Sequence, residues 1–130
     1  MMRRINGDRA VIAAFDGIRD ASVGMREALT SADWAGVARH LAAEWQHRKQ
    51  LAPGVTTPAI DGLFDRARAA GALAGKVCGA GGGGCLFCLV DPARQGAVAA
   101  ALAEGGATVL PFSFEADGLR VDETSAGVQR

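Results

Sequence analysis

The sequence has no tyrosine and few other aromatic residues, and it lacks a long hydrophobic run, a basic run and any net charge. Its 130 residues include five Phe, two Trp, 14 Lys or Arg and 14 Asp or Glu. A balanced charge without a basic cluster argues against nucleic-acid binding. No stretch approaches the roughly 18 apolar residues that a membrane-spanning helix needs, and the polar N-terminus does not resemble a signal peptide. We therefore expect contact with neither nucleic acid nor membrane.

Cysteine is also scarce, and the three cysteines are too few for a disulfide framework. Reduced thiols in a cytoplasmic protein are the simplest interpretation. Cys85-x-x-Cys88 could suggest a redox or zinc site, but a redox pair of this kind begins a helix. A structural zinc needs four ligands, and only Cys78 with a distant His40 or His47 could complete the set. We predict buried apolar thiols and no metal site.

Apolar residues are plentiful, at 49% of the sequence, which is enough for the core of one domain. We expect this domain to cover residues 8–121, with flexible termini at 1–7 and 122–130.

The first half of the chain predicts helices, because apolar residues recur at steps of three and four. One helix should run from near Asp8 to Leu29, with Val11, Phe15, Ile18, Met25 and Leu29 on its buried stripe. The next helix should bury Trp34, Val37, Leu41 and Trp45 and pair with the first as an antiparallel hairpin. Its other side should carry mostly polar residues, namely Arg39, His40, Glu44, His47 and Arg48. A third helix should begin with Thr57 as its cap and Pro58 in its first turn, and end at Gly71.

The second half predicts strands. Residues 73–78 are expected to form a short strand. The continuous apolar run 85–90 is typical of a strand buried on both faces. Asp91-Pro92 should open a helix that ends at Gly105. Residues 108–114 predict an edge strand, and Asp117-Gly118 a hairpin turn leading to another strand at 119–121. This order predicts an α+β domain, an antiparallel sheet with helices packed on one face, preceded by a helical hairpin.

The most distinctive feature is a glycine loop between the two apolar strands. Glycine loses conformational entropy on folding, so a run of glycines does little for stability. Without Cβ atoms, however, the backbone can approach a ligand and its N–H groups can line an anion site. Lys76 precedes the loop and could add positive charge. We predict a binding site there, with a flexible hairpin that binds no ligand as the alternative; the loop consists of Gly79, Ala80, Gly81, Gly82, Gly83 and Gly84.

Two common nucleotide motifs do not fit this loop. Gly79-x-Gly81-x-x-Gly84 matches the dinucleotide fingerprint formally, but that fingerprint requires a helix after the loop, whereas an apolar strand is expected here. The P-loop ends in Gly-Lys-Ser or Gly-Lys-Thr, whereas this loop ends in Gly84-Cys85.

The loop with its flanks resembles a motif of the GHMP kinases. Residues 75–85 read Gly-Lys-Val-Cys-Gly-Ala-Gly-Gly-Gly-Gly-Cys, similar to the third conserved motif of that family, which lies between two strands of its C-terminal domain. Residues 57–63, followed by Gly71-Ala72, resemble the helix before this motif. Residues 45–54 are similar to the heptose phosphate kinase branch. The resemblance covers about residues 8–121 and implies a ferredoxin-like C-terminal domain.

The resemblance implies ATP-dependent, Mg²⁺-assisted transfer of a phosphoryl group to a hydroxyl of a small metabolite, such as a sugar phosphate. In the family the glycine loop lines the interdomain cleft and supports the phosphate-binding region, and this role is carried onto residues 79–84. Arg48, Lys49 and Lys76 are predicted to bind substrate. For Arg48 and Lys49 the alternative is a solvated helix end. No catalytic residue is assigned.

The sequence also departs from the family pattern. The residue before Gly79 is commonly Ser or Thr, whereas Cys78 is a weak hydrogen-bonding group. The family's main nucleotide loop, Pro-x-x-x-Gly-x-Gly-Ser-Ser, is not found in these residues. We therefore expect this chain to be the C-terminal half of a kinase and to be inactive alone. It should pair with an N-terminal kinase half or with itself. The N-terminal half should make most of the contacts to ATP and Mg²⁺. The alternatives are a non-catalytic metabolite-binding or regulatory module and a ligand-free remnant that acts only by assembly.

Overall fold

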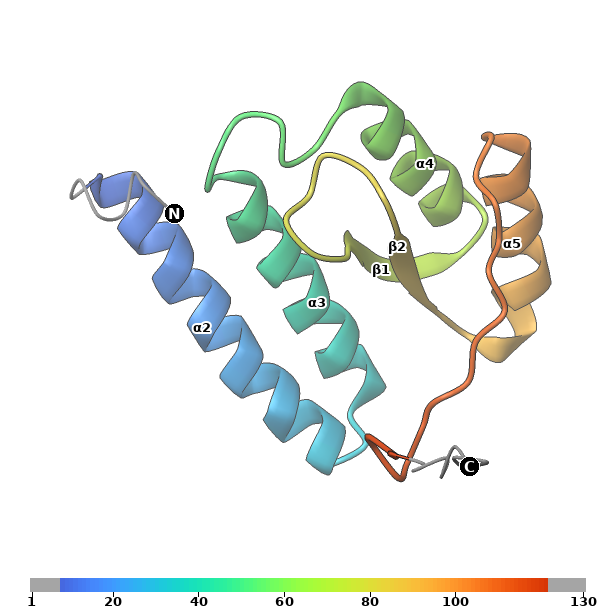
Figure 1. Cartoon of the computed structure of the whole chain (residues 1–130), viewed down its shortest axis with the longest axis horizontal. Coiled ribbons are helices and arrows are strands. Elements are labelled where there is room, and N and C mark those ends of the chain that lie inside the picture. The colour runs from blue at the N-terminus through green and yellow to red at the C-terminus, as the bar shows by residue number, and fades with distance from the viewer. Residues whose placement is uncertain (1–7, 122–130) are drawn as a thin grey trace, which may run out of the picture.

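A computed structural model describes residues 8–121 of the chain (Figure 1). The termini 1–7 and 122–130, predicted to be flexible, lie outside the described residues. No helix in the described part is long and apolar enough to cross a membrane. In chain order the elements are α2 (Arg9–Thr30), α3 (Trp34–Lys49), α4 (Pro58–Ala69), β1 (Ala72–Val77), β2 (Leu86–Val90), the short 3-10 helix η1 (Pro92–Arg94) and α5 (Gln95–Glu104).

Helices α2 and α3 form the predicted antiparallel hairpin (Figure 1). The carboxylate of Asp8 caps α2 by accepting from the N–H groups of Ala10 and Val11 at 3.0 and 3.2 Å. Asp33 caps α3 by accepting from the N–H of Gly36 at 2.9 Å. Each cap satisfies backbone donors that a helix start would leave unpaired, so the short turn between the helices is stabilised at the point where α3 begins.

The buried stripe of α2 differs from the predicted one. Its buried residues are Val11 and three alanines at seven-residue steps, Ala14, Ala21 and Ala28, whereas Leu29 is exposed. Small residues let α3 approach closely, and the wide side chains of α3 fill the space that remains. Gly17 and Gly24 of α2 lie beneath the rings of His47 and His40, and a Cβ atom on either glycine would lie under 3.0 Å from the ring.

Four residues of α3 differ from the predicted arrangement, and two of them are His40 and His47, which lie against α2 rather than on the polar side. Trp34 is 59% exposed rather than in the core, because it is the first residue of the helix and lies beyond the packed region. Glu44, predicted to lie on the polar side, is buried, because its position on α3 faces β1. Trp45 is buried as predicted and contacts Phe64 of α4, with ring centroids 5.7 Å apart.

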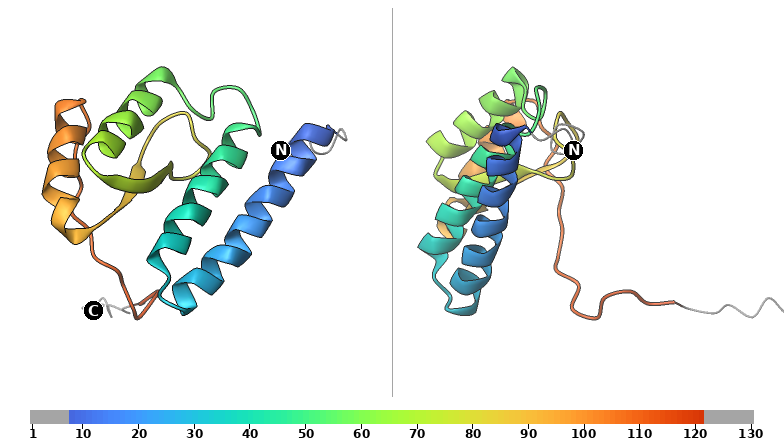
Figure 2. Two further views of the ribbon diagram at one scale, coloured as in Figure 1. Left: turned by 180° about the vertical axis from the view of Figure 1, so that it is seen from behind. Right: turned by 90° about the vertical axis from the view of Figure 1, so that its left-hand side faces the viewer.

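Helix α4 begins as predicted, with the Thr57 hydroxyl accepting from the N–H of Ile60 and Pro58 in the first turn. Strands β1 and β2 pair antiparallel, with Val77 opposite Leu86. The core lies between α3, α4 and this sheet, and Figure 2 shows the helices gathered on one side of the strands. The α+β prediction is therefore confirmed; the core consists of Trp45, Val55, Ile60, Phe64 and Val77.

The second strand is less buried than its apolar sequence predicts. Phe87 is 42% exposed, because strand alternation points it away from the side on which its neighbours Leu86 and Cys88 pack against the core. The prediction of burial on both faces is therefore wrong.

The segment after α5 is also not as predicted. Residues 108–114 form no strand, and no hairpin forms at Asp117-Gly118. The segment extends away from the helices and strands (Figure 2), and its apolar residues are exposed, with Phe114 at 94%. A strand needs a partner edge to satisfy its backbone groups, and residues 8–121 provide none beside this segment.

Candidate functional site

The glycine loop connects the facing ends of β1 and β2 and is anchored at one point. The N–H of Gly82 donates to the carbonyl oxygen of Val55 at 2.8 Å. Val55 is a core residue in the connection between α3 and α4. The loop is therefore tied to the hydrophobic core, although most of its residues are exposed.

Glycine is required where the loop meets this connection. Gly81 has a φ of +93°, a conformation that side chains disfavour. A Cβ atom there would lie 2.6 Å from the carbonyl oxygen of Val55, and one at Gly82 would lie 3.0 Å from that of Gly54. These two glycines allow the contact with residues 54 and 55, and so have a structural function that the sequence did not reveal.

The other glycines of the loop have a different environment. A Cβ atom at Gly79, Gly83 or Gly84 would meet nothing within 4 Å. These positions face open space, so their backbone can be approached from outside. An exposed run of backbone without side chains can bring N–H groups to an anion such as a phosphate.

Two of the three predicted substrate-binding cations meet on one buried carboxylate. The Glu44 Oε1 atom accepts from the Arg48 Nε atom at 2.7 Å and also from Arg48 Nη2. The same oxygen accepts from the Lys76 Nζ atom at 2.7 Å. These contacts join α3 to β1 just before the glycine loop. The interactions orient both cations and leave one net positive charge for the three side chains together.

The charge state of Glu44 follows from this network. Burial by itself would raise its pKa, but hydrogen bonds from Arg48 and Lys76, together with their positive charges, outweigh burial and hold the pKa of Glu44 below its usual value. The carboxylate is therefore ionised at neutral pH. Its Oε2 atom is buried and has no hydrogen-bond partner among the described residues.

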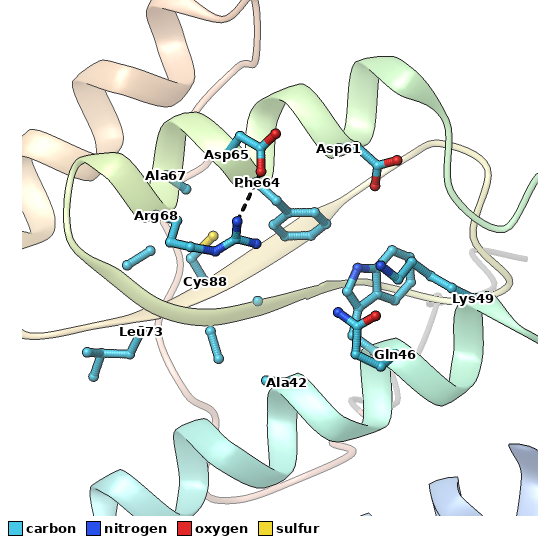
Figure 3. Close-up of a pocket in the computed structure, with 14 residues that line it drawn as sticks. Ala42, Gln46, Lys49, Asp61, Phe64, Asp65, Ala67, Arg68, Leu73 and Cys88 are labelled. Atoms are coloured by element: carbon cyan, nitrogen blue, oxygen red, sulfur yellow. Dashed lines mark hydrogen bonds and ion pairs between the residues drawn. The ribbon is translucent and has the colours of Figure 1, made fainter.

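Lys49, the third predicted cation, lies elsewhere. It lines a cavity of about 350 Å³ between α3, α4 and β1. Figure 3 shows Phe64 and Cys88 in the interior and charged side chains, including the hydrogen-bonded pair Asp65 and Arg68, toward the α4 side. No residue of the glycine loop lines this cavity. The structure therefore brings Arg48 and Lys76 together and separates Lys49 from them.

The three cysteines do not share one environment. Cys88 lies partly buried against the core, and burial raises the pKa of its thiol. Cys78 and Cys85 are exposed at the two ends of the glycine loop. The prediction of buried thiols is therefore wrong for Cys85, because it lies just outside strand β2. Within residues 8–121, no group of three or more His, Cys, Asp or Glu side chains could hold a metal ion.

Sequence reasoning missed Glu44 and Val55 as parts of this site. A signal for Glu44 was present, since it lies three residues after Leu41 and directly before Trp45, on the apolar stripe of α3. A charged residue on such a stripe indicates a buried partner of opposite charge. Val55 gave no comparable signal, because its contact with the loop depends on tertiary folding.

Comparisons with known proteins agree with these features. The family described as GHMP kinases C terminal matches residues 25–108. The chain is 32% identical over 114 residues to D-glycero-alpha-D-manno-heptose 7-phosphate kinase of Campylobacter jejuni, covering 88% of this chain and 34% of that kinase. It is 43% identical over 70 residues to mevalonate kinase of Thermococcus gammatolerans, covering 54% of this chain and 21% of that enzyme.

This chain thus spans between a fifth and a third of the length of these relatives. The matched region contains helix α3, the capped helix α4 and the glycine loop with both flanking strands. On this evidence the chain belongs to the GHMP kinase C-terminal family.

Proposed function

We propose that this chain completes the nucleotide and substrate cleft of an ATP-dependent small-molecule kinase by presenting its glycine loop to phosphate groups. The observation that carries this proposal is the loop itself, which is anchored to Val55 at Gly82 and faces open space at Gly79, Gly83 and Gly84. Phosphoryl transfer depends mainly on positioning and on stabilising negative charge. An anchored loop that exposes backbone groups suits the positioning of a phosphate.

The proposed substrate is a sugar or sugar phosphate, with a heptose phosphate as the first candidate. The similarity to the heptose 7-phosphate kinase covers 88% of this chain, against 54% for the mevalonate kinase. The surplus positive charge of the network formed by Glu44, Arg48 and Lys76 favours an anionic substrate. We place Lys76 and Arg48 nearest to that substrate, with Lys49 as a more distant contact.

A partner is part of the same proposal, either an N-terminal kinase half or a second copy of this chain. Large apolar side chains are exposed on the sheet at Leu73 and Phe87, and on the segment after α5. Phe112 and Phe114 contact each other edge to face, with centroids 5.7 Å apart, yet are both exposed. Contact with another protein surface would remove these apolar side chains from water. A free-standing metabolite sensor would be expected to have a polar outer face.

We further propose that Mg²⁺ and most of the ATP are held by the N-terminal half, with residues 79–84 contacting phosphate oxygens. ATP supplies the phosphoryl group that is transferred. A cytoplasmic location belongs to this proposal, because a metabolite kinase acts where ATP is abundant.

A chimera provides a direct test. The C-terminal third of the Campylobacter kinase would be replaced by this chain, and ADP formation would be followed with heptose 7-phosphate and ATP-Mg²⁺. We expect turnover by the chimera and none by the 130-residue chain alone. Gly82→Ala should reduce chimera turnover at least tenfold, because its Cβ atom would crowd the Gly54 carbonyl oxygen. The matched control is Gly62→Ala on α4, where a Cβ atom meets nothing within 4 Å.

The outcomes separate the alternatives. If the folded chimera does not turn over, while the chain alone binds a sugar phosphate or ATP in calorimetry, the kinase proposal is wrong and a binding or regulatory module replaces it. If the chain binds neither compound and the chimera is inactive, a remnant that acts by assembly is the remaining interpretation.

A further inference from the structure

The two exposed cysteines face each other across the neck of the glycine loop. The register of β1 and β2 pairs Val77 with Leu86, so the next pair outward is Cys78 and Cys85. The N–H of Cys78 donates to the carbonyl oxygen of Cys85 at 2.8 Å, which continues the ladder by one pair. Both thiols are free and exposed.

Directly opposed residues in an antiparallel pair have side chains on the same face of the sheet. Val77 and Leu86 point toward the core, so the alternation of strand side chains directs Cys78 and Cys85 to the opposite, open face. Hydrogen-bonded pairs have Cα atoms about 5.5 Å apart. That separation lies within the roughly 4.4–6.8 Å range of Cα separations that disulfides span. The Cβ atoms of a hydrogen-bonded pair lie about 5.5 Å apart, about 1 Å more than in a disulfide, so a bond between the two sulfurs draws the strand ends together and is strained.

The third cysteine cannot replace either member of this pair. Cys88 lies three positions from Cys85 along the chain and packs partly buried against the core. Burial raises the pKa of the Cys88 thiol, which disfavours the reactive thiolate. The geometry thus selects one pair of the three possible pairs.

We propose that Cys78 and Cys85 form a redox-active dithiol that hydrogen peroxide converts to an intramolecular disulfide across the neck of the glycine loop. The thiolate of one cysteine attacks the peroxide, whose O–O bond breaks, giving a sulfenic acid and hydroxide. The second thiolate attacks the sulfenic sulfur, forming the S–S bond and releasing a second hydroxide. Two electrons pass from the two sulfurs to the peroxide, and the hydroxides take up the two thiol protons to give water.

The bond would close a ring around residues 79–84. The strand ends at 78 and 85 are already hydrogen-bonded, so the bond would draw them slightly closer and restrict the loop. Exposed and strained disulfides are readily reduced, which makes the modification reversible. An effect of oxidation on ligand binding rests on the proposed function of the loop, whereas the disulfide itself does not.

Mass spectrometry of the 130-residue chain tests this directly. The chain would be treated with a small excess of hydrogen peroxide, alkylated without reduction, and digested. We expect loss of two hydrogen atoms from the intact mass, a cross-linked peptide joining Cys78 to Cys85, and a Cys88 that is alkylated. Glutathione redox buffers should reverse the modification.

Three variants make the test decisive. Cys88→Ser should oxidise like the parent chain, whereas Cys78→Ser and Cys85→Ser should each lose the intramolecular disulfide. Circular dichroism would establish that each variant is folded, as expected for substitutions at the two exposed sites. A folded Cys88→Ser chain that gives only intermolecular dimers or sulfinic acid would overturn the proposal, as would a Cys85–Cys88 bond in the parent chain. Neither result bears on the kinase chimera, so failure here is distinguishable from failure of the proposed function.

Discussion

Replacing Glu44 with glutamine should destabilise the fold substantially, because it leaves two cations facing each other without their shared carboxylate. The side chain of Glu44 is 10% exposed, against 18% for Lys76 and 24% for Arg48. Removing one partner of a fully buried ion pair costs about 3–5 kcal/mol. Because both cations retain some contact with water, we expect a loss of about 2–3 kcal/mol for Glu44→Gln at neutral pH. With a urea m-value of about 2 kcal/mol/M, the midpoint should fall by about 1 M.

The loss should depend on pH in a defined direction. The pKa of Glu44 is lower in the folded state than its ordinary value. Its stabilising contribution is therefore complete above the pKa of the unfolded chain and is lost as the pH falls through the folded pKa. The difference in unfolding free energy between the parent chain and Glu44→Gln should be constant near neutrality and should shrink below about pH 4.

Urea denaturation followed by helical circular dichroism measures both effects. The matched control is Asp65→Asn, which removes the carboxylate of an exposed pair with Arg68 and should change stability by less than about 0.5 kcal/mol. A double-mutant cycle with Lys76→Met should give a coupling energy of about 1–3 kcal/mol with Glu44→Gln. If Glu44→Gln costs no more than Asp65→Asn, or if its cost does not change with pH, the buried network does not stabilise the fold as argued.

Three smaller predictions concern backbone and surface. Gly81→Ala should lower the melting temperature and the free energy of unfolding, the latter by about 2 kcal/mol or more, because a positive φ is combined with a close approach to the Val55 carbonyl. Gly79 also has a positive φ but faces open space, so Gly79→Ala should lower the free energy of unfolding by only about 1 kcal/mol. Gly62→Ala should raise stability by about 0.5–1 kcal/mol, because it adds helix propensity in open space; a loss would contradict the placement of α4. Phe114→Ser should leave unfolding within about 0.5 kcal/mol of the parent chain but weaken self-association in light scattering, and a large destabilisation would mean that the segment after α5 packs against the domain.

The helices and the first two strands could be predicted because their signals are local. Thr57-Pro58 and Asp91-Pro92 are short-range caps, and both begin helical structure where expected. The glycine loop was also recognisable, since no regular element accommodates five glycines in six residues. These signals come from residues that are adjacent in the sequence, so reading them requires no knowledge of the tertiary contacts.

Most of the failures share one cause, namely packing partners that lie far away in the sequence. The prediction for residues 108–114 depended on a neighbouring strand, which the described residues do not supply. Trp34 has the hydrophobicity of a core residue but occupies the exposed start of α3. Conversely, Ala14, Ala21 and Ala28 are buried although alanine gives a weak hydrophobic signal. Whether a residue is buried depends on which other element packs against it. The periodicity of the sequence does not specify that element.

The hydrogen bond from Gly82 to Val55 has a further consequence for the loop. A glycine-rich segment of this length would ordinarily sample many conformations, and a ligand would have to select among them. Because the middle of the loop is attached to a buried residue, part of that freedom is lost when the domain folds, before any ligand arrives. The attachment also links the loop to the connection between α3 and α4. A ligand that displaces Gly82 would therefore also shift Val55, which lies three residues before the first residue of α4.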